Sequence, residues 1–338
     1  MGKFHIILID RKYEAEVRRK RMEYDQMNPT INRIIENIEK VIIGKRNEAE
    51  LSIVALLAAG HVLLEDVPGV GKTMMVRALA KSIGASFNRI QFTPDLLPSD
   101  VTGISMYDPK EMDFHFRPGP LMGNIILADE INRTSPKTQS ALLEAMEESS
   151  ITIDGITHTL EQPFFVMATQ NSIEYEGTYP LPEAQLDRFL LKMKMGYPAI
   201  AEEMEVLNRA QKNPPIQELE PVIRLEELRD LQSKIKEVYV DDFIKRYIVT
   251  IADRTRAHAS VYLGVSPRGS IALMKAAQAY AFMNGRDFAI PDDVQYLAPF
   301  VFAHRMILKS EAKFEGLSAE EIINRVIARI PVPIQRFV

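Results

Sequence analysis

Short apolar runs alternate with helical patterns along the first part of the chain. Between the runs, apolar residues recur at the spacing of an amphipathic helix, for example after Thr73 and after Pro136. Strands that alternate with helices are typical of a parallel sheet with helices on both faces. The runs that predict strands are 61–64, 89–92, 124–128, 164–168 and 189–193. The pattern therefore predicts an α/β domain with a five-stranded parallel sheet.

The pattern changes after Pro198. Helical periodicity runs through almost all of residues 200–338, and only a few prolines interrupt it. A series of helices without strands predicts a separate all-α domain. We expect an α/β domain over residues 29–198, an all-α domain over residues 199–338 and an N-terminal extension, residues 1–28, without an assigned role.

Local signals predict where helices begin and where hairpins form. Thr30 precedes an isoleucine-rich helical pattern and is a candidate N-cap, and Ser135 followed by Pro136 has the arrangement of an N-cap and a first helical residue. Weak alternation over residues 103–117 predicts one hairpin. The Asp-Gly pair at 154–155, flanked by alternating residues, predicts a second one.

Composition narrows the possible functions. The chain of 338 residues has a net charge of −5, so it does not have the broadly basic surface of a non-specific nucleic-acid binder. It has no cysteine, and its six histidines are scattered, which argues against a thiolate or histidine metal site. No apolar run reaches the length of a membrane span, and the short run 4–9 lacks the features of a signal peptide. We therefore expect a cytoplasmic protein.

The first strand leads into a glycine-rich turn and then into a helix. Residues 66–73 read Asp-Val-Pro-Gly-Val-Gly-Lys-Thr, which matches a phosphate-binding loop except that Asp66 replaces the first glycine. In such a loop Lys72 reaches the β- and γ-phosphates, and the Thr73 hydroxyl holds Mg²⁺. Asp66 tolerates a left-handed backbone, but its carboxylate would lie near phosphates. The alternative is a structural turn that binds nothing.

Polar residues follow the third and fourth predicted strands. Asp129 and Glu130 end the third strand, where carboxylates of a parallel sheet lie beside the phosphate loop. We expect Asp129 to hold Mg²⁺ and Glu130 to orient and polarise the attacking water. Asn171 ends the fourth strand, whose tip we expect between the loop and Asp129, within reach of the γ-phosphate or the water. Solvent-facing strand ends are the structural alternative.

Two arginines are candidates for binding phosphate. Arg188 lies just before the fifth strand, where it could reach the nucleotide of a neighbouring subunit as an arginine finger, or could pair with Glu183 or Asp187. Arg268 lies in the first turn of a predicted helix, where a cation is unfavourable unless it serves something outside the helix. The alternative is an ordinary surface arginine. Arg133 is a further, weaker candidate.

Taken together and in order, these motifs resemble those of AAA+ ATPases, and several longer phrases closely resemble the MoxR family. The likeness extends from about residue 29 to the end of the chain. The phrases that carry it are Val-Ile-Ile-Gly at 41–44, Ala-Asp-Glu-Ile-Asn-Arg at 128–133, Ala-Leu-Leu-Glu-Ala-Met-Glu-Glu at 141–148, Ala-Thr-Gln-Asn at 168–171 and Tyr-Pro-Leu-Pro-Glu-Ala-Gln-Leu-Asp-Arg-Phe at 179–189.

The resemblance implies a role for each site residue. Lys72 and Thr73 belong to Walker A, Asp129 and Glu130 to Walker B, Asn171 is sensor 1, Arg188 is the arginine finger and Arg268 is sensor 2. ATP or ADP with Mg²⁺ would be bound, with Thr73 and Asp129 as metal ligands. The implied nucleotide-binding set is Ile42, Ile43, Gly44, Pro68, Gly69, Val70, Gly71, Lys72, Thr73, Met74 and Asp129. The all-α domain would be the AAA+ lid.

The resemblance also implies an assembly and a class of partner. The segment after Phe92 and the hairpin at 154–155 would be two inserts that face the pore of a hexameric ring. MoxR proteins act as chaperone-like remodellers of protein partners, including von Willebrand factor A domain proteins and their metal sites.

Two other functions stay open at this stage. A nucleic-acid translocase is one, although neither predicted hairpin offers a basic or aromatic stacking surface. A nucleotide-gated switch with little hydrolysis is the other, and Asp66 is the residue that supports it.

Overall fold

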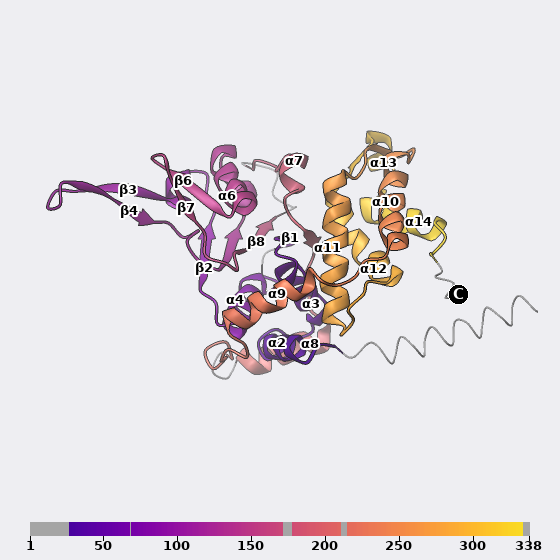
Figure 1. Cartoon of the computed structure of the whole chain (residues 1–338), viewed down its shortest axis with the longest axis horizontal. Coiled ribbons are helices and arrows are strands. Elements are labelled where there is room, and N and C mark those ends of the chain that lie inside the picture. The colour runs from indigo at the N-terminus through magenta and orange to yellow at the C-terminus, as the bar shows by residue number, and fades with distance from the viewer. Residues whose placement is uncertain (1–26, 68, 172–177, 211–214, 334–338) are drawn as a thin grey trace, which may run out of the picture.

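The computed structural model describes residues 27–67, 69–171, 178–210 and 215–333. Figure 1 shows a sheet wrapped by helices in the middle, a long hairpin that projects to one side, and a group of helices on the other. The last group comes from the C-terminal part of the chain. The predicted α/β architecture followed by a helical part is confirmed.

Five parallel strands form the central sheet. In spatial order they are β2 (Phe87–Gln91), β5 (Ile125–Asp129), β8 (Phe165–Gln170), β1 (Val62–Glu65) and β9 (Leu191–Met193). The fourth predicted strand therefore lies between the first and the third, as expected. The last strand begins two residues later than predicted, because the N–H of Phe189 still closes a turn onto the carbonyl of Leu186.

Helices cover both faces of this sheet because successive strand residues point to opposite sides. Leu64 and Leu127 pack with α2 (Pro29–Glu39), α3 (Arg46–Leu57) and α4 (Lys72–Ser82). Leu63 and Ile126 pack on the other face with α6 (Pro136–Glu148). The shorter elements of this part are α5 (Pro98–Thr102), the 3₁₀ turn η1 (Ile131–Arg133) and α7 (Glu183–Leu186).

One of the two predicted helix starts is wrong. The N-cap of α2 is Asn28, whose Oδ1 accepts hydrogen bonds from the N–H groups of Thr30 and Ile31 at 3.0 and 3.4 Å. Pro29 occupies the first helical position, which it favours, so the cap must precede it and Thr30 lies inside the helix. Ser135 and Pro136 begin α6 as predicted.

Both predicted hairpins form. The first consists of β3 (Gly103–Asp108) and β4 (Asp113–Pro118), and the second of β6 (Ser150–Ile153) and β7 (Ile156–Thr159). Figure 1 shows both on the same side of the molecule, with the first extending farthest. They contact one another through Phe116 and His158, whose rings stack 4.0 Å apart.

The C-terminal part is helical with one small exception. A two-stranded antiparallel sheet joins β10 and β11, which the helical periodicity did not predict. The elements are α8 (Ile200–Ala210), α9 (Leu225–Ile235), α10 (Asp242–Arg256), β10 (Val261–Leu263), α11 (Pro267–Met283), α12 (Pro291–Phe302), the 3₁₀ turn η2 (Ala303–Arg305), β11 (Ile307–Leu308), α13 (Ser310–Phe314) and α14 (Ala319–Arg329).

The two parts share buried surface. One continuous core includes Leu56 of α3, Leu228 of α9 and Leu273 of α11. The side chain of Gln232 on α9 also donates to the carbonyl of Leu56 at 2.7 Å. The exact division at residue 198 stays a prediction. Within the described ranges, no helix combines the length and the apolar character needed to cross a bilayer.

Candidate active site

The phosphate loop has the backbone that its glycines allow. Gly69 and Gly71 have φ angles of 86° and 91°, which side chains with a Cβ rarely adopt. A Cβ at either glycine would meet no atom within 4 Å, so the φ angle rather than crowding requires glycine. The helix α4 begins directly at Lys72, so its positive end points at the loop. Pro68 lies outside the described residues.

A cavity of about 400 Å³ lies between the loop and the tips of three strands. Polar side chains from separate motifs therefore meet in one place, as the order of strands predicted. Its lining consists of Gly69, Gly71, Lys72, Thr73, Met74, Arg89, Gln91, Asp129, Glu130, Thr169 and Asn171. The size and the polar lining suit a triphosphate at the end of a helix.

Asp129 is held from two sides. Its Oδ1 accepts a hydrogen bond of 2.6 Å from the hydroxyl of Thr169, and its Oδ2 forms an ion pair of 2.7 Å with Arg89. Thr73 lines the same cavity. Carboxylate and hydroxyl oxygens are the ligands that Mg²⁺ prefers, so the residues present fit this metal. A metal bound through Oδ2 would have to displace Arg89.

Glu130 has an unusual backbone and a fixed carboxylate. Its φ of 58° is positive, a strained conformation for a residue with a side chain. Its N–H donates to the Thr169 hydroxyl at 2.8 Å, and its Oε2 accepts hydrogen bonds from Gln91 at 2.8 Å and Arg133 at 3.0 Å. The strand tip therefore orients Glu130 into the cavity, and Gln91 controls the direction of its carboxylate.

A second cavity of about 470 Å³ adjoins the first and has an apolar lining suited to a base. The two cavities share Gly69, Gly71 and Met74. Of the residues expected against adenine, Ile42 and Ile43 line this cavity, together with Val70. Gly44 does not line it. Gly44 has a φ of 69° and packs against the carboxylate of Glu202 from α8.

Asp66 serves the fold rather than the phosphates. Its Oδ2 accepts hydrogen bonds from the N–H groups of Met195 and Gly196 at 2.7 and 2.6 Å, and it does not line the phosphate cavity. Its φ is not positive, so glycine is not required here. The ammonium of Lys45 binds the carbonyl oxygens of Met195 and Tyr197. The start of the loop is thus tied to the segment that leads out of the sheet.

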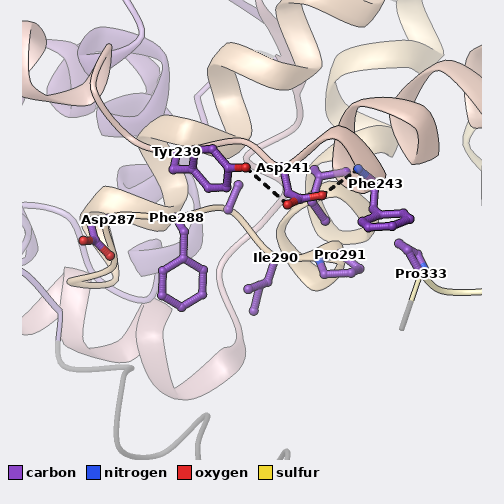
Figure 2. A pocket seen from close by; sticks show the side chains of 10 residues that line it. Tyr239, Asp241, Phe243, Asp287, Phe288, Ile290, Pro291 and Pro333 are labelled. Carbon is purple, nitrogen blue, oxygen red and sulfur yellow. Dashed lines mark hydrogen bonds between the residues drawn. The ribbon is translucent and has the colours of Figure 1, made fainter. Parts of the chain in front are cut away.

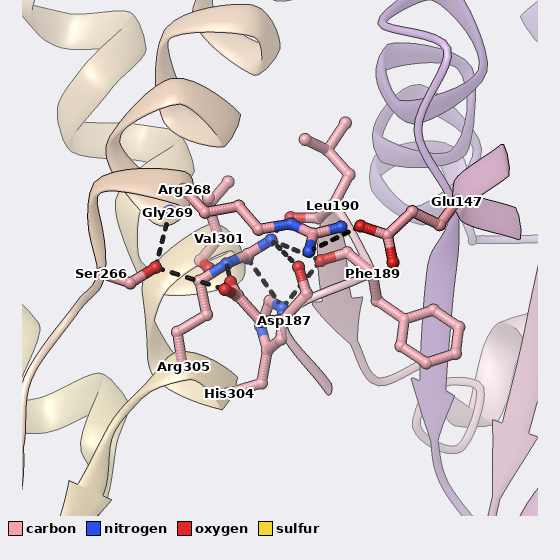
Figure 3. A network of polar contacts seen from close by, with 10 residues as sticks. All are labelled: Glu147, Asp187, Phe189, Leu190, Ser266, Arg268, Gly269, Val301, His304 and Arg305. Atoms are coloured by element: carbon pink, nitrogen blue, oxygen red, sulfur yellow. Dashed lines mark hydrogen bonds and ion pairs between the residues drawn. The ribbon is translucent and has the colours of Figure 1, made fainter. Parts of the chain in front are cut away.

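Arg188 and Arg268 do not line the phosphate cavity of their own chain, and both bind Glu147; Figure 3 shows Arg268 and Glu147. Arg188 forms an ion pair with Glu147 at 3.0 Å, and Arg268 forms one with the same carboxylate at 3.2 Å. The expected alternative, a pair between Arg188 and either Glu183 or Asp187, is wrong. Arg188 pairs with Glu147 instead, because α6 ends beside the turn that carries Arg188.

Four residues of the site were missed from the sequence. Arg89 and Gln91 could have been found, because they lie two residues apart at the end of a strand and so share one face. Thr169 sits in the predicted strand tip beside Asn171. Glu147 carried no local signal, since its partners are distant in the sequence.

A third cavity, of about 390 Å³, lies within the helical part (Figure 2). It is lined mainly by aromatic and proline side chains of α10, α12 and the loops beside them, including Tyr239, Phe243, Phe288 and Pro291. None of the predicted site residues lines it, so it adds nothing to the phosphate site.

Comparisons with known proteins agree with the fold. Residues 61–191 match the family model described as "ATPase family associated with various cellular activities (AAA)", and residues 253–326 match "AAA lid domain". The chain is 66% identical over 312 residues to the "Uncharacterized protein YeaC" of Bacillus subtilis, covering 92% of this chain and 98% of the relative. It is 42% identical over 313 residues to "Chaperone MoxR1" of Mycobacterium tuberculosis, covering 90% and 82%. A crystal structure of a putative ATPase from Cytophaga hutchinsonii superposes with a TM-score of 0.85 at 36% identity, covering 95% and 99%.

Proposed function

Because the chain belongs to the MoxR family of AAA+ ATPases, we propose that it hydrolyses ATP and uses the cycle to remodel protein partners. The observation that carries the proposal is the single cavity that joins the phosphate loop to Asp129, Glu130 and Asn171. This is the set of groups that phosphoryl transfer to water requires.

The residues divide the chemistry between them. Lys72 and the loop N–H groups neutralise and hold the β- and γ-phosphates, and the adjoining apolar cavity with Ile42 and Ile43 takes the base. Thr73 and Asp129 would hold Mg²⁺, which supplies positive charge to the phosphate oxygens. Glu130 orients and polarises the attacking water, and Asn171 hydrogen-bonds the γ-phosphate or that water.

Gln91 and Arg133 both bind Oε2 of Glu130, so opening the bond to Gln91 would free the carboxylate to turn toward a water. That bond is 2.8 Å long and exposed to solvent, so water can replace it at little cost. We infer that Gln91 holds the carboxylate in an unreactive direction when the site lacks nucleotide.

The positive charge that completes the site comes from a neighbouring protomer in this proposal. Arg188 and Arg268 do not line the cavity of their own chain, and their side chains are 27% and 47% exposed. An exposed guanidinium pair suits the phosphate of an adjoining subunit, where an arginine finger raises turnover by orders of magnitude. A closed ring, a hexamer in this proposal, supplies every site with such a neighbour.

A protein substrate suits the projecting hairpin. Met106, Tyr107, Met112 and Phe114 expose apolar side chains on β3, β4 and the turn between them, and Tyr107 contacts Phe114 with ring centroids 5.3 Å apart. The exposed aromatic pair corrects the expectation that this hairpin offers no stacking surface. The hairpin is nevertheless not basic, because Asp108, Glu111 and Asp113 accompany Lys110 and Arg117, and this balance favours polypeptide over a phosphate backbone. Von Willebrand factor A domain proteins, including those whose metal sites need maturation, are the partner class that we propose.

The test compares two variants in a steady-state ATPase assay and a fluorescent-nucleotide binding assay. Lys72→Ala removes the phosphate cation, so both nucleotide affinity and turnover should fall. Glu130→Gln should bind ATP as tightly as the wild type and turn over at least a hundred-fold more slowly. Normal hydrolysis by Glu130→Gln would show that this carboxylate does not orient the water. A Glu130→Gln trap should also capture the protein partner.

A further inference from the structure

One carboxylate, that of Glu147, binds both Arg188 and Arg268. Glu147 Oε2 is 3.0 Å from Arg188 Nε, and Glu147 Oε1 is 3.2 Å from Arg268 Nη1. Glu147 lies near the end of α6, Arg188 in the turn before β9, and Arg268 in the first turn of α11. Figure 3 shows the Glu147 side chain meeting Arg268, which reaches across from the helical part.

Behind these arginines, a buried network fixes the two backbones that carry them. Asp187, next to Arg188, binds Arg305 Nε through Oδ1 at 2.6 Å and Ser266 Oγ through Oδ2 at 3.2 Å. The Arg305 side chain is 3% exposed. Burial lowers the pKa of Arg305 to about 10, against the opposing effect of Asp187, so it stays charged at neutral pH. Ser266 is the N-cap of α11, the helix that begins with Arg268.

This network brings two permanently charged guanidinium groups to one place. Like charges that share a carboxylate repel one another, and at this exposure the repulsion is only partly screened by water. Glu147 lies between them and reduces the local charge from +2 to +1. Each arginine still has other N–H donors for a phosphate, because arginine carries five and the described pair with Glu147 uses one.

We propose that Glu147 is a positioning residue that holds Arg188 and Arg268 as a matched pair, so that both can be presented together to the nucleotide of the neighbouring protomer. This inference rests on the proposed ATPase function. Glu147 touches neither nucleotide nor water in it and acts only through the arginines. The two guanidinium groups therefore bind the phosphates together.

The first experiment is a double-mutant cycle on the full-length protein. Glu147→Gln should lower kcat about ten-fold, the effect of two modest ion pairs, and leave the KM for ATP unchanged. Arg268→Gln removes one of the two cations, so adding Glu147→Gln to it should cost no more than about two-fold. Glu147→Asp keeps the charge and should retain more activity than Glu147→Gln. Glu148→Gln, a neighbouring exposed carboxylate on the same helix, is the matched control and should match the wild type.

The second experiment does not depend on hydrolysis. Phenylglyoxal labelling, followed by mass spectrometry of the peptides that carry Arg188 and Arg268, reports how firmly each guanidinium is held. Glu147→Gln should raise labelling of both several-fold, and Glu148→Gln should not. Unchanged labelling and unchanged kcat in Glu147→Gln overturn the positioning role while the ATPase proposal stands. A wild type that does not hydrolyse ATP overturns the ATPase proposal, and the labelling result then decides whether Glu147 pairs the arginines.

Discussion

Asp66 replaces the first glycine of the phosphate-loop pattern. Substituting it tests whether this residue weakens nucleotide binding or stabilises the fold. The carboxylate is 8% exposed and accepts two backbone hydrogen bonds of 2.7 and 2.6 Å from Met195 and Gly196. A hydrogen bond to a charged group contributes about 1.5–3 kcal/mol, and a buried N–H that loses its partner costs a similar amount. Asp66→Ala should therefore lower the free energy of unfolding by about 3–5 kcal/mol.

The affinity for nucleotide should fall together with the stability. The backbone carbonyl of Asp66 accepts a hydrogen bond of 3.1 Å from Lys72, so loosening this residue also loosens the phosphate cation. We expect Asp66→Ala to bind fluorescent ADP more weakly than the wild type. Asp66→Asn keeps the shape and one acceptor oxygen, and should lose about 1–2 kcal/mol of stability.

The assays are urea unfolding followed by circular dichroism and a titration with fluorescent ADP. The competing explanation is that the carboxylate repels phosphate, which predicts tighter ADP binding in both variants and no loss of stability. An Asp66→Ala protein with the wild-type urea midpoint and a higher ADP affinity would refute the tether. A lower midpoint with weaker binding would support it.

Three further predictions concern groups elsewhere in the chain. The buried His61 donates from Nε2 to the Met146 carbonyl and accepts the Val166 N–H at Nδ1, both at 3.1 Å, and burial lowers its pKa from 6.5 to about 4. The free energy of unfolding should therefore be constant above pH 6.5 and fall by about 3 kcal/mol toward pH 4, at about 1.4 kcal/mol per pH unit. In His61→Gln the urea midpoint should change less with pH over this range. An equally steep curve in the variant would contradict this. Arg286→Met leaves the Asp293 carboxylate, 2% exposed, without its ion-pair partner, so urea unfolding should show a loss of about 3–5 kcal/mol, and a loss below about 1 kcal/mol would contradict the burial argument. Arg188→Ala should leave fluorescent-ADP affinity unchanged and abolish the rise of specific ATPase activity with protein concentration, and a variant that keeps this rise would argue against a shared site.

The order of motifs along the chain was enough to predict the sheet and to bring the proposed phosphate-binding residues to one edge of it. Gly69 and Gly71 have positive φ angles that few other residues adopt, so the residue types alone predict the loop. Asp129 and Asn171 end apolar strands, and in a parallel sheet such ends lie at one edge. Pro68 remains untested because it lies outside the described residues.

Local sequence misplaced features whose partners lie elsewhere. Thr30 looked like a cap, yet Pro29 moves the cap to Asn28. Gly44, which the family resemblance places against adenine, does not line the adjoining cavity and packs on Glu202 from a helix far along the chain, and its adenine contact stays a prediction. The strand pairing of β10 with β11 was missed because each strand is short and the two are separated by two helices.

The sequence by itself determined the class of fold, the family and most of the residues that line the cavity proposed for the phosphates, because these depend on backbone conformation and on the edge at which parallel strands end. Only the tertiary structure decided what Asp66 holds and which carboxylate joins Arg188 to Arg268. Those contacts connect residues that are distant in the chain. The identity of a side chain does not indicate which distant residue packing will place beside it.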